Sequence, residues 1–316
     1  MKKLLSFFVL MAVLALAPAA WTQQTFINIG TGPVGGTYYP VGSAMAKIWT
    51  DSLNGVSANA QSTGGTRNNI QLMGDGDAEA GFADGLSYDA YNGLNTFDGQ
   101  PQTFLRTLAP LYPEVIHILV AKGSGIKTLA DLKGKRISIG AVGGSVAATA
   151  AVLLEAVGLN IEKDIRAEYL GHADAVAGFG DRRIDAAVIV GAIGIASAVE
   201  PTTMDLVEIL PIPPEVVEKV VRKIPYYFPF SIPADTYKGQ TGAVSTFSSP
   251  NILAVHEKLD PDLVYNMTKA LFERKADLVA VTKTMEGMRA EDITAVRIPL
   301  HPGARKYYEE LGILEK

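Results

Sequence analysis

Two matching glycine turns are the segments of this sequence best suited to chemistry. One reads TGPVGGT over residues 31–37, and the other reads GAVGGS over residues 140–145. Each follows a short apolar run and precedes a segment with the apolar spacing of a helix. A strand, a glycine turn and a helix start bring free backbone N–H groups and a positive dipole end to one point. The pair predicts two α/β lobes with similar anion sites, which face one cleft and hold a carboxylate-bearing solute between them.

Small polar residues of these turns are the first candidates for ligand contacts. Thr37 and Ser145 are expected to cap the helices that follow, because a hydroxyl there can accept a hydrogen bond from a free N–H group. Tyr38 directly follows the first turn and could form an aromatic wall of the cleft, with core packing as the alternative. The candidates from the two turns are Gly35, Gly36, Thr37 and Tyr38, together with Gly143, Gly144 and Ser145. A purely structural role of the turns is the competing interpretation.

A third strand end rich in glycine and hydroxyl groups reads STGGTRN over residues 62–68. Its candidates for contacts to polar ligand atoms are Thr63, Gly64, Gly65 and Thr66. Arg67 could bind a carboxylate through two nitrogens, or it could be a solvated arginine on a helix face. His172 opens a helix after the strand expected to end at Leu170, so it could contact the ligand or serve only in packing.

Several enzyme signatures are absent from the sequence. Residues 30–35, GTGPVG, match the glycine pattern of a dinucleotide site. Such a site needs an acidic residue at the end of the next strand, and the expected strand 56–61 has none. The four histidines lack metal-site spacing, and no motif pairs a nucleophile with a base. We therefore expect a binding protein with no catalytic residue, no metal site and no cofactor; an enzyme on this fold is an alternative.

The first residues have the pattern of a secretory signal. Lys2 and Lys3 precede an apolar run over residues 4–16, and a small-residue cleavage site follows at 17–19. The run is shorter than the ~20 residues that span a bilayer, so we expect a cleaved signal peptide over residues 1–20 rather than a membrane anchor. The chain has no cysteine, which excludes a lipid-modified cysteine at the signal junction. We expect a soluble periplasmic protein without a lipid anchor.

The 316 residues suffice for two domains, and a net charge of −5 without a basic cluster argues against nucleic-acid partners. Apolar runs alternate with segments of helical spacing, which predicts an α/β fold with parallel sheets and ligands at the carboxyl ends of strands. The expected strands are residues 26–29, 56–61, 80–83, 115–121, 137–139, 167–170, 185–190, 206–210 and 251–256. Residues 211–250 are rich in proline and aromatic residues and are expected to return the chain between the lobes. One helix is expected over 261–281. We expect lobe one at residues 24–112 and 225–316, and lobe two at residues 113–224.

Four segments carry a likeness to a known family. They are GTGPVGGTYYPVG at 30–42, STGGTRNN at 62–69, IPYYFPFSIPADTYKGQ at 224–240 and PLHPGARKYYEELG at 299–312. In these segments the chain resembles the solute receptors of tripartite ATP-independent periplasmic (TRAP) transporters, in their TAXI branch. The resemblance implies a type II periplasmic-binding-protein fold, in which a hinge joins two lobes and the ligand lies in the cleft between them. It also implies a monomer that captures a small carboxylate, such as glutamate or a related acid, and delivers it to a TRAP membrane permease without catalysis.

The likeness places ligand contacts on the two glycine turns and on residues 63–66. The sequence departs from the family pattern at the second turn, where one hydroxyl is lost or displaced after Ser145, and behind the third strand. There the family often has a glutamine, a small residue and an aspartate, whereas this chain has Asp84 next to Gly85. Asp84 is therefore a further candidate, and the polar set of the cleft is changed. An ABC-type substrate-binding protein and a ligand-sensing receptor of a membrane kinase remain alternatives.

Overall fold

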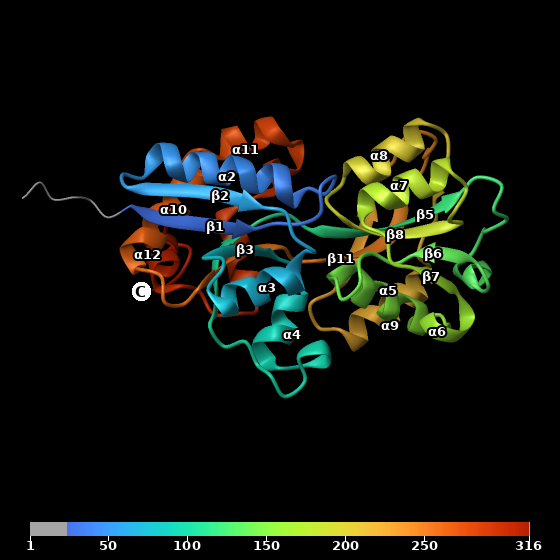
Figure 1. Cartoon of the computed structure of the whole chain (residues 1–316), viewed down its shortest axis with the longest axis horizontal. Helices are drawn as coiled ribbons and strands as arrows, with labels where there is room; N and C mark the ends of the chain where they lie inside the picture. Colours follow the sequence, from blue (N-terminus) through green and yellow to red (C-terminus); the bar gives the residue numbers. More distant parts are fainter. Residues whose placement is uncertain (1–23, 316) are drawn as a thin grey trace, which may run out of the picture.

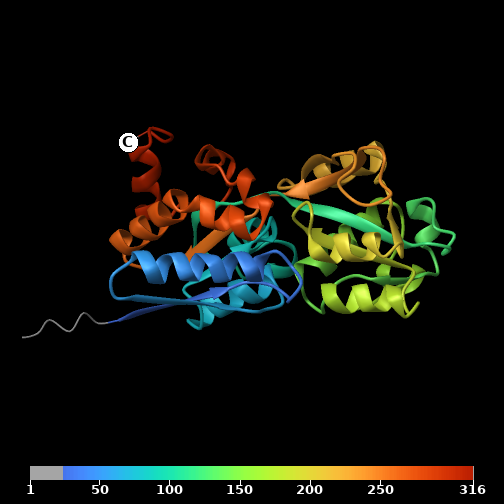
Figure 2. The same ribbon diagram turned by 90° about the horizontal axis from the view of Figure 1, so that it is seen from above.

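The computed structural model describes residues 24–315, so the expected signal peptide lies outside the described residues. These residues form two lobes side by side, each built on one sheet with helices on both faces (Figure 1). The view from above shows the same two lobes meeting along a narrow waist (Figure 2). In the part of the chain that the structure describes, no helix is both long and apolar enough to cross a bilayer.

The first lobe is built on a five-stranded sheet in the order β2-β1-β3-β12-β4. Its strands are β1 (Thr25–Gly30), β2 (Val56–Gln61), β3 (Ala80–Ala83), β4 (Leu105–Pro110) and β12 (Ile252–His256). Its helices are α2 (Tyr38–Ser52), α3 (Thr66–Asp75), α4 (Leu86–Asn92), α10 (Pro261–Glu273), α11 (Lys275–Val281) and α12 (Pro302–Glu310). The first three strands are parallel, but β12 runs antiparallel to β3 and β4. The expectation of a purely parallel sheet is therefore wrong, because the chain returns from the second lobe and inserts β12 between β3 and β4.

The second lobe is built on a seven-stranded sheet in the order β10-β11-β5-β8-β6-β7, with β9 paired to β5. Its strands are β5 (Glu114–Ala121), β6 (Arg136–Ser138), β7 (Arg166–Glu168), β8 (Ala186–Gly191), β9 (Val207–Ile209), β10 (Phe228–Ile232) and β11 (Val244–Ser249). Its helices are α5 (Ser145–Ala156), α6 (Ile161–Asp164), α7 (His172–Gly180), α8 (Ala196–Thr203) and α9 (Pro214–Lys223). This sheet is mixed as well, since β5 is antiparallel to β8 whereas β6 is parallel to β7 and β8.

The segment expected to return the chain between lobes instead forms two strands. β10 and β11 pair with each other, and β11 pairs with β5 of the second sheet. This pairing places residues 228–249 with the second sheet, whereas the expected division assigns them to lobe one. The chain returns to the first sheet after Ser249, where β11 ends, and β12 starts at Ile252.

Two short crossings join the lobes, and hydrogen bonds tie them together. The N–H of Leu111 donates to the carbonyl of Asn251 over 2.8 Å, which links the outgoing crossing to the returning one. The Asn251 amide nitrogen donates to Oε1 of Glu114 over 2.9 Å, and the hydroxyl of Ser248 donates to the Glu114 carbonyl over 2.8 Å. The two crossings therefore form one connected hinge.

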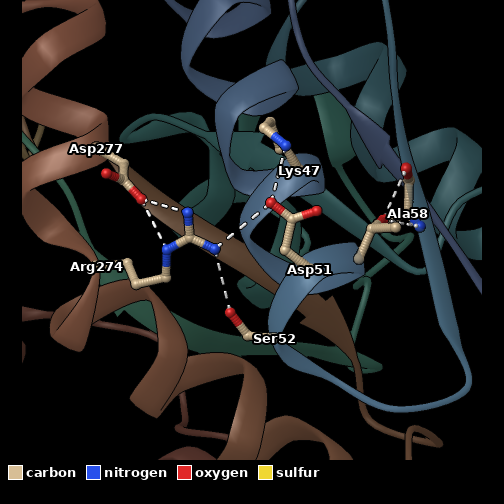
Figure 3. Close-up of polar contacts among 7 residues, drawn as sticks. Lys47, Asp51, Ser52, Ala58, Arg274 and Asp277 are labelled. Atoms are coloured by element: carbon tan, nitrogen blue, oxygen red, sulfur yellow. Dashed lines mark hydrogen bonds and ion pairs between the residues drawn. The ribbon is translucent and has the colours of Figure 1, made fainter.

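One expected helix is broken in two. The interval 261–281 contains α10 and α11, which are separated at Arg274. The guanidinium of Arg274 donates from Nε to Asp277 over 2.7 Å and from a terminal nitrogen to the hydroxyl of Ser52 over 3.3 Å (Figure 3). A second ion pair joins Lys47 to Asp51 over 2.8 Å on the neighbouring α2. The break lets both helices pack along α2, and Trp49 of α2 is buried there with its indole N–H bonded to the carbonyl of Met267.

Candidate functional site

A small cavity lies between the two lobes. Its volume is about 50 Å³. Nine of the residues expected to bind ligand line it: Gly36, Thr37, Tyr38, Gly64, Gly65 and Asp84 from the first lobe, with Gly144, Ser145 and His172 from the second. The two glycine turns therefore face one shared cavity, as the sequence pattern predicts.

The two glycine turns have the same backbone geometry. In the first, the N–H of Gly36 donates to the carbonyl of Pro33 over 3.0 Å, and in the second, Gly144 donates to Ala141 over 3.0 Å. The third residue of each turn has a positive φ, 93° at Gly35 and 70° at Gly143. This is the arrangement of a type II turn, which favours glycine at that position. Gly35 and Gly143 thus shape the turns and do not line the cavity.

The fourth residue of each turn, again a glycine, allows close approach between the lobes. A Cβ on Gly36 would lie 3.1 Å from the carbonyl oxygen of Pro33 and 3.6 Å from Nδ1 of His172. A Cβ on Gly144 would lie 3.1 Å from the carbonyl oxygen of Ala141 and 3.4 Å from that of Gly64, across the cleft. Side chains at these two positions would fill the space that separates the lobes.

Four helices begin at the cavity. They are α2, α3, α5 and α7, and their N-cap residues are Thr37, Gly65, Gly144 and Gly171. Three of these residues are glycines, and none of the four makes a side-chain cap hydrogen bond. The first N–H groups of each helix have no partner within the helix, so they are available to an anion in the cavity.

This geometry corrects the expectation that Thr37 and Ser145 cap helices α2 and α5. Thr37 holds the N-cap position of α2, but its own backbone is helical and its hydroxyl makes no cap hydrogen bond. Ser145 is not a cap, because Gly144 holds that position and Ser145 is the first residue of α5. Both side chains line the cavity instead.

Three further expected residues lie outside the cavity lining. The hydroxyl of Thr63 donates to Thr31 and accepts from the N–H of Gly65, so it shapes its own loop. The hydroxyl of Thr66 accepts from the N–H of Asp84 over 3.0 Å. Arg67 is exposed, and its guanidinium carbon lies 5.8 Å from the centre of the Phe97 ring.

His172 is the buried imidazole of the cavity. Its side chain is 6% exposed, and neither ring nitrogen has a hydrogen-bond partner within residues 24–315. Burial lowers the pKa of His172 to about 4, so the imidazole is neutral at pH 7. A neutral ring offers one donor and one acceptor to a ligand. Behind it, burial also lowers the pKa of His117 to about 4, and His117 Nε2 lies 2.8 Å from the hydroxyl of Tyr237.

The sequence interpretation missed one charged residue of the cavity. Glu114 is the first residue of β5 and lines the cavity with Asp84. Burial raises the pKa of both carboxyl groups, and the nearby charge of Asp84 raises that of Glu114 further. No motif singled out Glu114, because an isolated acid at a strand start has no sequence signature. Outside the masked termini, no group of three or more His, Asp or Glu residues could hold a metal ion.

The two mixed sheets, the double crossing and the cavity between the lobes define a periplasmic-binding-protein fold. Solved structures share it. A protein from Bordetella bronchiseptica RB50 is 18% identical, with a TM-score of 0.59 over 92% of this chain and 99% of its own. A structure described as a periplasmic transporter is 14% identical, with a TM-score of 0.58 over 91% of this chain and 92% of its own. An ancestral arginine-binding protein bound to arginine is 17% identical, with a TM-score of 0.50 over 84% of this chain and all of its own.

The family model of the NMT1-like family matches residues 29–312, which is nearly the whole described chain. The chain belongs to the NMT1-like family.

Proposed function

We propose that this chain is a solute receptor that closes its two lobes around a small carboxylate-bearing solute. An amino acid such as glutamate or a related organic acid fits this class. The observation that carries the proposal is the convergence of four helix starts without side-chain caps on one cavity between the lobes. Each helix start favours an anion by roughly 0.3–1 kcal/mol, and by up to about 2 kcal/mol where it is partly buried.

Contacts from both lobes support a binding role with hinge closure. Residues from each side line the same cavity, and Gly65 lies close to Ser145 across it, with a Cβ at Gly65 placed 3.8 Å from the Ser145 hydroxyl. A solute held by both lobes stabilises the closed state because it gains contacts there that the open state lacks. A membrane partner could then recognise the closed shape.

The proposal also includes the membrane permease that receives the solute. The TAXI-like segments of the sequence support a TRAP-type permease driven by an ion gradient, with the receptor acting as a monomer in the periplasm, without cofactor or catalysis. An ABC-type permease is the other candidate, and neither the NMT1-like match nor the shared fold favours the TRAP partner over it. A gene for a large multi-span permease beside this one would support the TRAP partner, and a gene for an ATPase would support the ABC partner.

A thermal-shift screen over amino acids, dicarboxylates and sulfonates tests the receptor proposal. A true ligand at a hundredfold excess over its Kd should stabilise the folded protein by about 2.7 kcal/mol. A matched series of neutral and cationic solutes serves as the control. Stabilisation by members of the control series alone would contradict the proposal.

A further inference from the structure

Two buried carboxyl groups lie in the cavity beside the anion site. Asp84 follows β3 directly in the first lobe, and Glu114 starts β5 at the hinge. Asp84 is 6% exposed and Glu114 is 3% exposed, and both line the cavity. The two carboxyl groups lie close enough for the charge of Asp84 to act on Glu114, so we treat them as one acidic part of the lining.

Neither carboxyl group has a protein counter-ion. No ion pair within residues 24–315 includes Asp84 or Glu114. Their hydrogen bonds come from neutral donors: the N–H of Leu86 at 3.0 Å from Oδ1 of Asp84, and the amide of Asn251 at 2.9 Å from Oε1 of Glu114. A buried carboxylate without a cation is costly, so it takes up a proton or receives a cation from elsewhere.

The rest of the cavity offers the opposite polarity. His172 is buried, and neither of its ring nitrogens has a partner within residues 24–315. Four helices also begin at residues that line the same space. A ligand with only an acidic group would satisfy this side and leave the two carboxyl groups of Asp84 and Glu114 unmatched. A ligand with a cationic group as well would match both.

We propose that Asp84 and Glu114 form an ammonium subsite, and that the solute is a small zwitterion whose acidic group lies at the helix starts. The inference rests on the proposed function, because it takes the acid-binding cavity as given. The volume of about 50 Å³ favours a compact solute, since one water needs about 10–15 Å³ of such space. The solutes that we expect are therefore small amino acids whose ammonium group lies one or two carbons from the carboxylate or sulfonate.

Paired calorimetric titrations of the purified protein test the subsite. Each pair consists of an amino compound and the same acid without its amine: glycine and acetate, L-alanine and propionate, L-glutamate and glutarate, taurine and ethanesulfonate. We expect the amino member of the binding pair to bind roughly a hundredfold more tightly than the acid without the amine. The acid alone leaves the buried carboxyl groups of Asp84 and Glu114 unmatched. Equal binding of both members overturns the ammonium subsite and leaves the receptor proposal standing. Binding of no compound in the set overturns both.

Neutral variants of the same shape identify the residues. In Asp84→Asn and Glu114→Gln we expect the preference for the amino member to fall by about tenfold or more, with a smaller change for the acid alone. Asp75→Asn is the control, because Asp75 is an exposed acid at the end of α3 that does not line this cavity. It should keep the preference of the parent protein. A preference that is unchanged in both cavity variants overturns the assignment, and if either variant fails to fold, the ratio in the parent protein decides.

Discussion

The ring of Tyr226 from the second lobe lies directly on Gly85 of the first lobe, where any added Cβ would overlap the ring. The hydroxyl of Tyr226 also donates to Oδ2 of Asp89 over 3.1 Å. Gly85 follows Asp84 of the cavity, so this contact holds the lobes together beside the site. This contact between the lobes therefore requires that residue 85 has no side chain.

We expect Gly85→Ala to prevent full closure. The added methyl group cannot share space with the Tyr226 ring, so the lobes must stay further apart and the solute loses contacts to one of them. Affinity should fall by about tenfold or more, and small-angle scattering should show a larger radius of gyration at saturating solute than in the parent. The control is Gly180→Ala, where a Cβ meets no atom within 4 Å. Parent-like affinity in Gly85→Ala would refute this role of the contact.

The cavity hydroxyls should contribute equally from both lobes. Thr37→Val and Ser145→Ala each remove one hydroxyl from the lining while keeping most of the shape. Each should cost roughly 0.5–1.5 kcal/mol of binding free energy, which is about a three- to tenfold loss of affinity. Calorimetry measures this, and the melting temperature of the ligand-free protein should change little. Ser43→Ala, on the exposed side of α2, is the control. If both cavity variants bind as tightly as the parent, neither hydroxyl contacts the solute and this prediction is wrong.

The buried imidazoles should make the ligand-free protein less stable in acid. Burial lowers the pKa of His117 and His172 to about 4, below the ordinary value of 6.5, so the unfolded state binds protons that the folded state does not. The imidazole contribution to stability is full above pH 6.5 and falls as the pH drops from 6.5 to 4, by about 3 kcal/mol for each imidazole. The raised pKa values of Asp84 and Glu114 act in the opposite sense, because their contribution is lost as the pH rises above their ordinary values of 3.8 and 4.5.

Comparison with a variant separates these effects. Urea unfolding at pH 7, 6, 5 and 4.5 should show a shallower pH dependence for His172→Gln than for the parent, since only one buried imidazole then remains. The carboxyl groups are common to both proteins and cancel in the difference. Parallel curves for the two proteins would show that His172 is not buried in its neutral form.

Local patterns predicted much of each lobe. The strands at 56–61 and 80–83 match β2 and β3 at both ends, because apolar runs bounded by turn residues define short buried strands. β10 was missed because Pro229 lies within it. Proline is tolerated there because β10 is an edge strand of its sheet, and this position depends on the tertiary fold. The insertion of β12 between β3 and β4 likewise depends on where the chain returns.

The sequence predicted those parts of the site that local backbone turns form. It did not predict the parts that only the tertiary fold brings together. The glycine turns have a local signature, and both line the cavity through Gly36 and Gly144. Thr63 and Thr66 fit the same pattern, but their hydroxyls bond within lobe one. Glu114 reaches the cavity only because β5 starts at the hinge, and no local pattern contains that fact.

A crystal structure of the complex tests the central claim most directly. The protein would be crystallised with the amino acid that binds best in the paired titrations. We expect the solute between the lobes, with its acidic group in hydrogen-bond reach of backbone N–H groups at the starts of both α2 and α5, and its ammonium beside Asp84 and Glu114. A solute bound by one lobe alone, or in the separate groove lined by Tyr112, Phe230 and Thr284, would contradict the account.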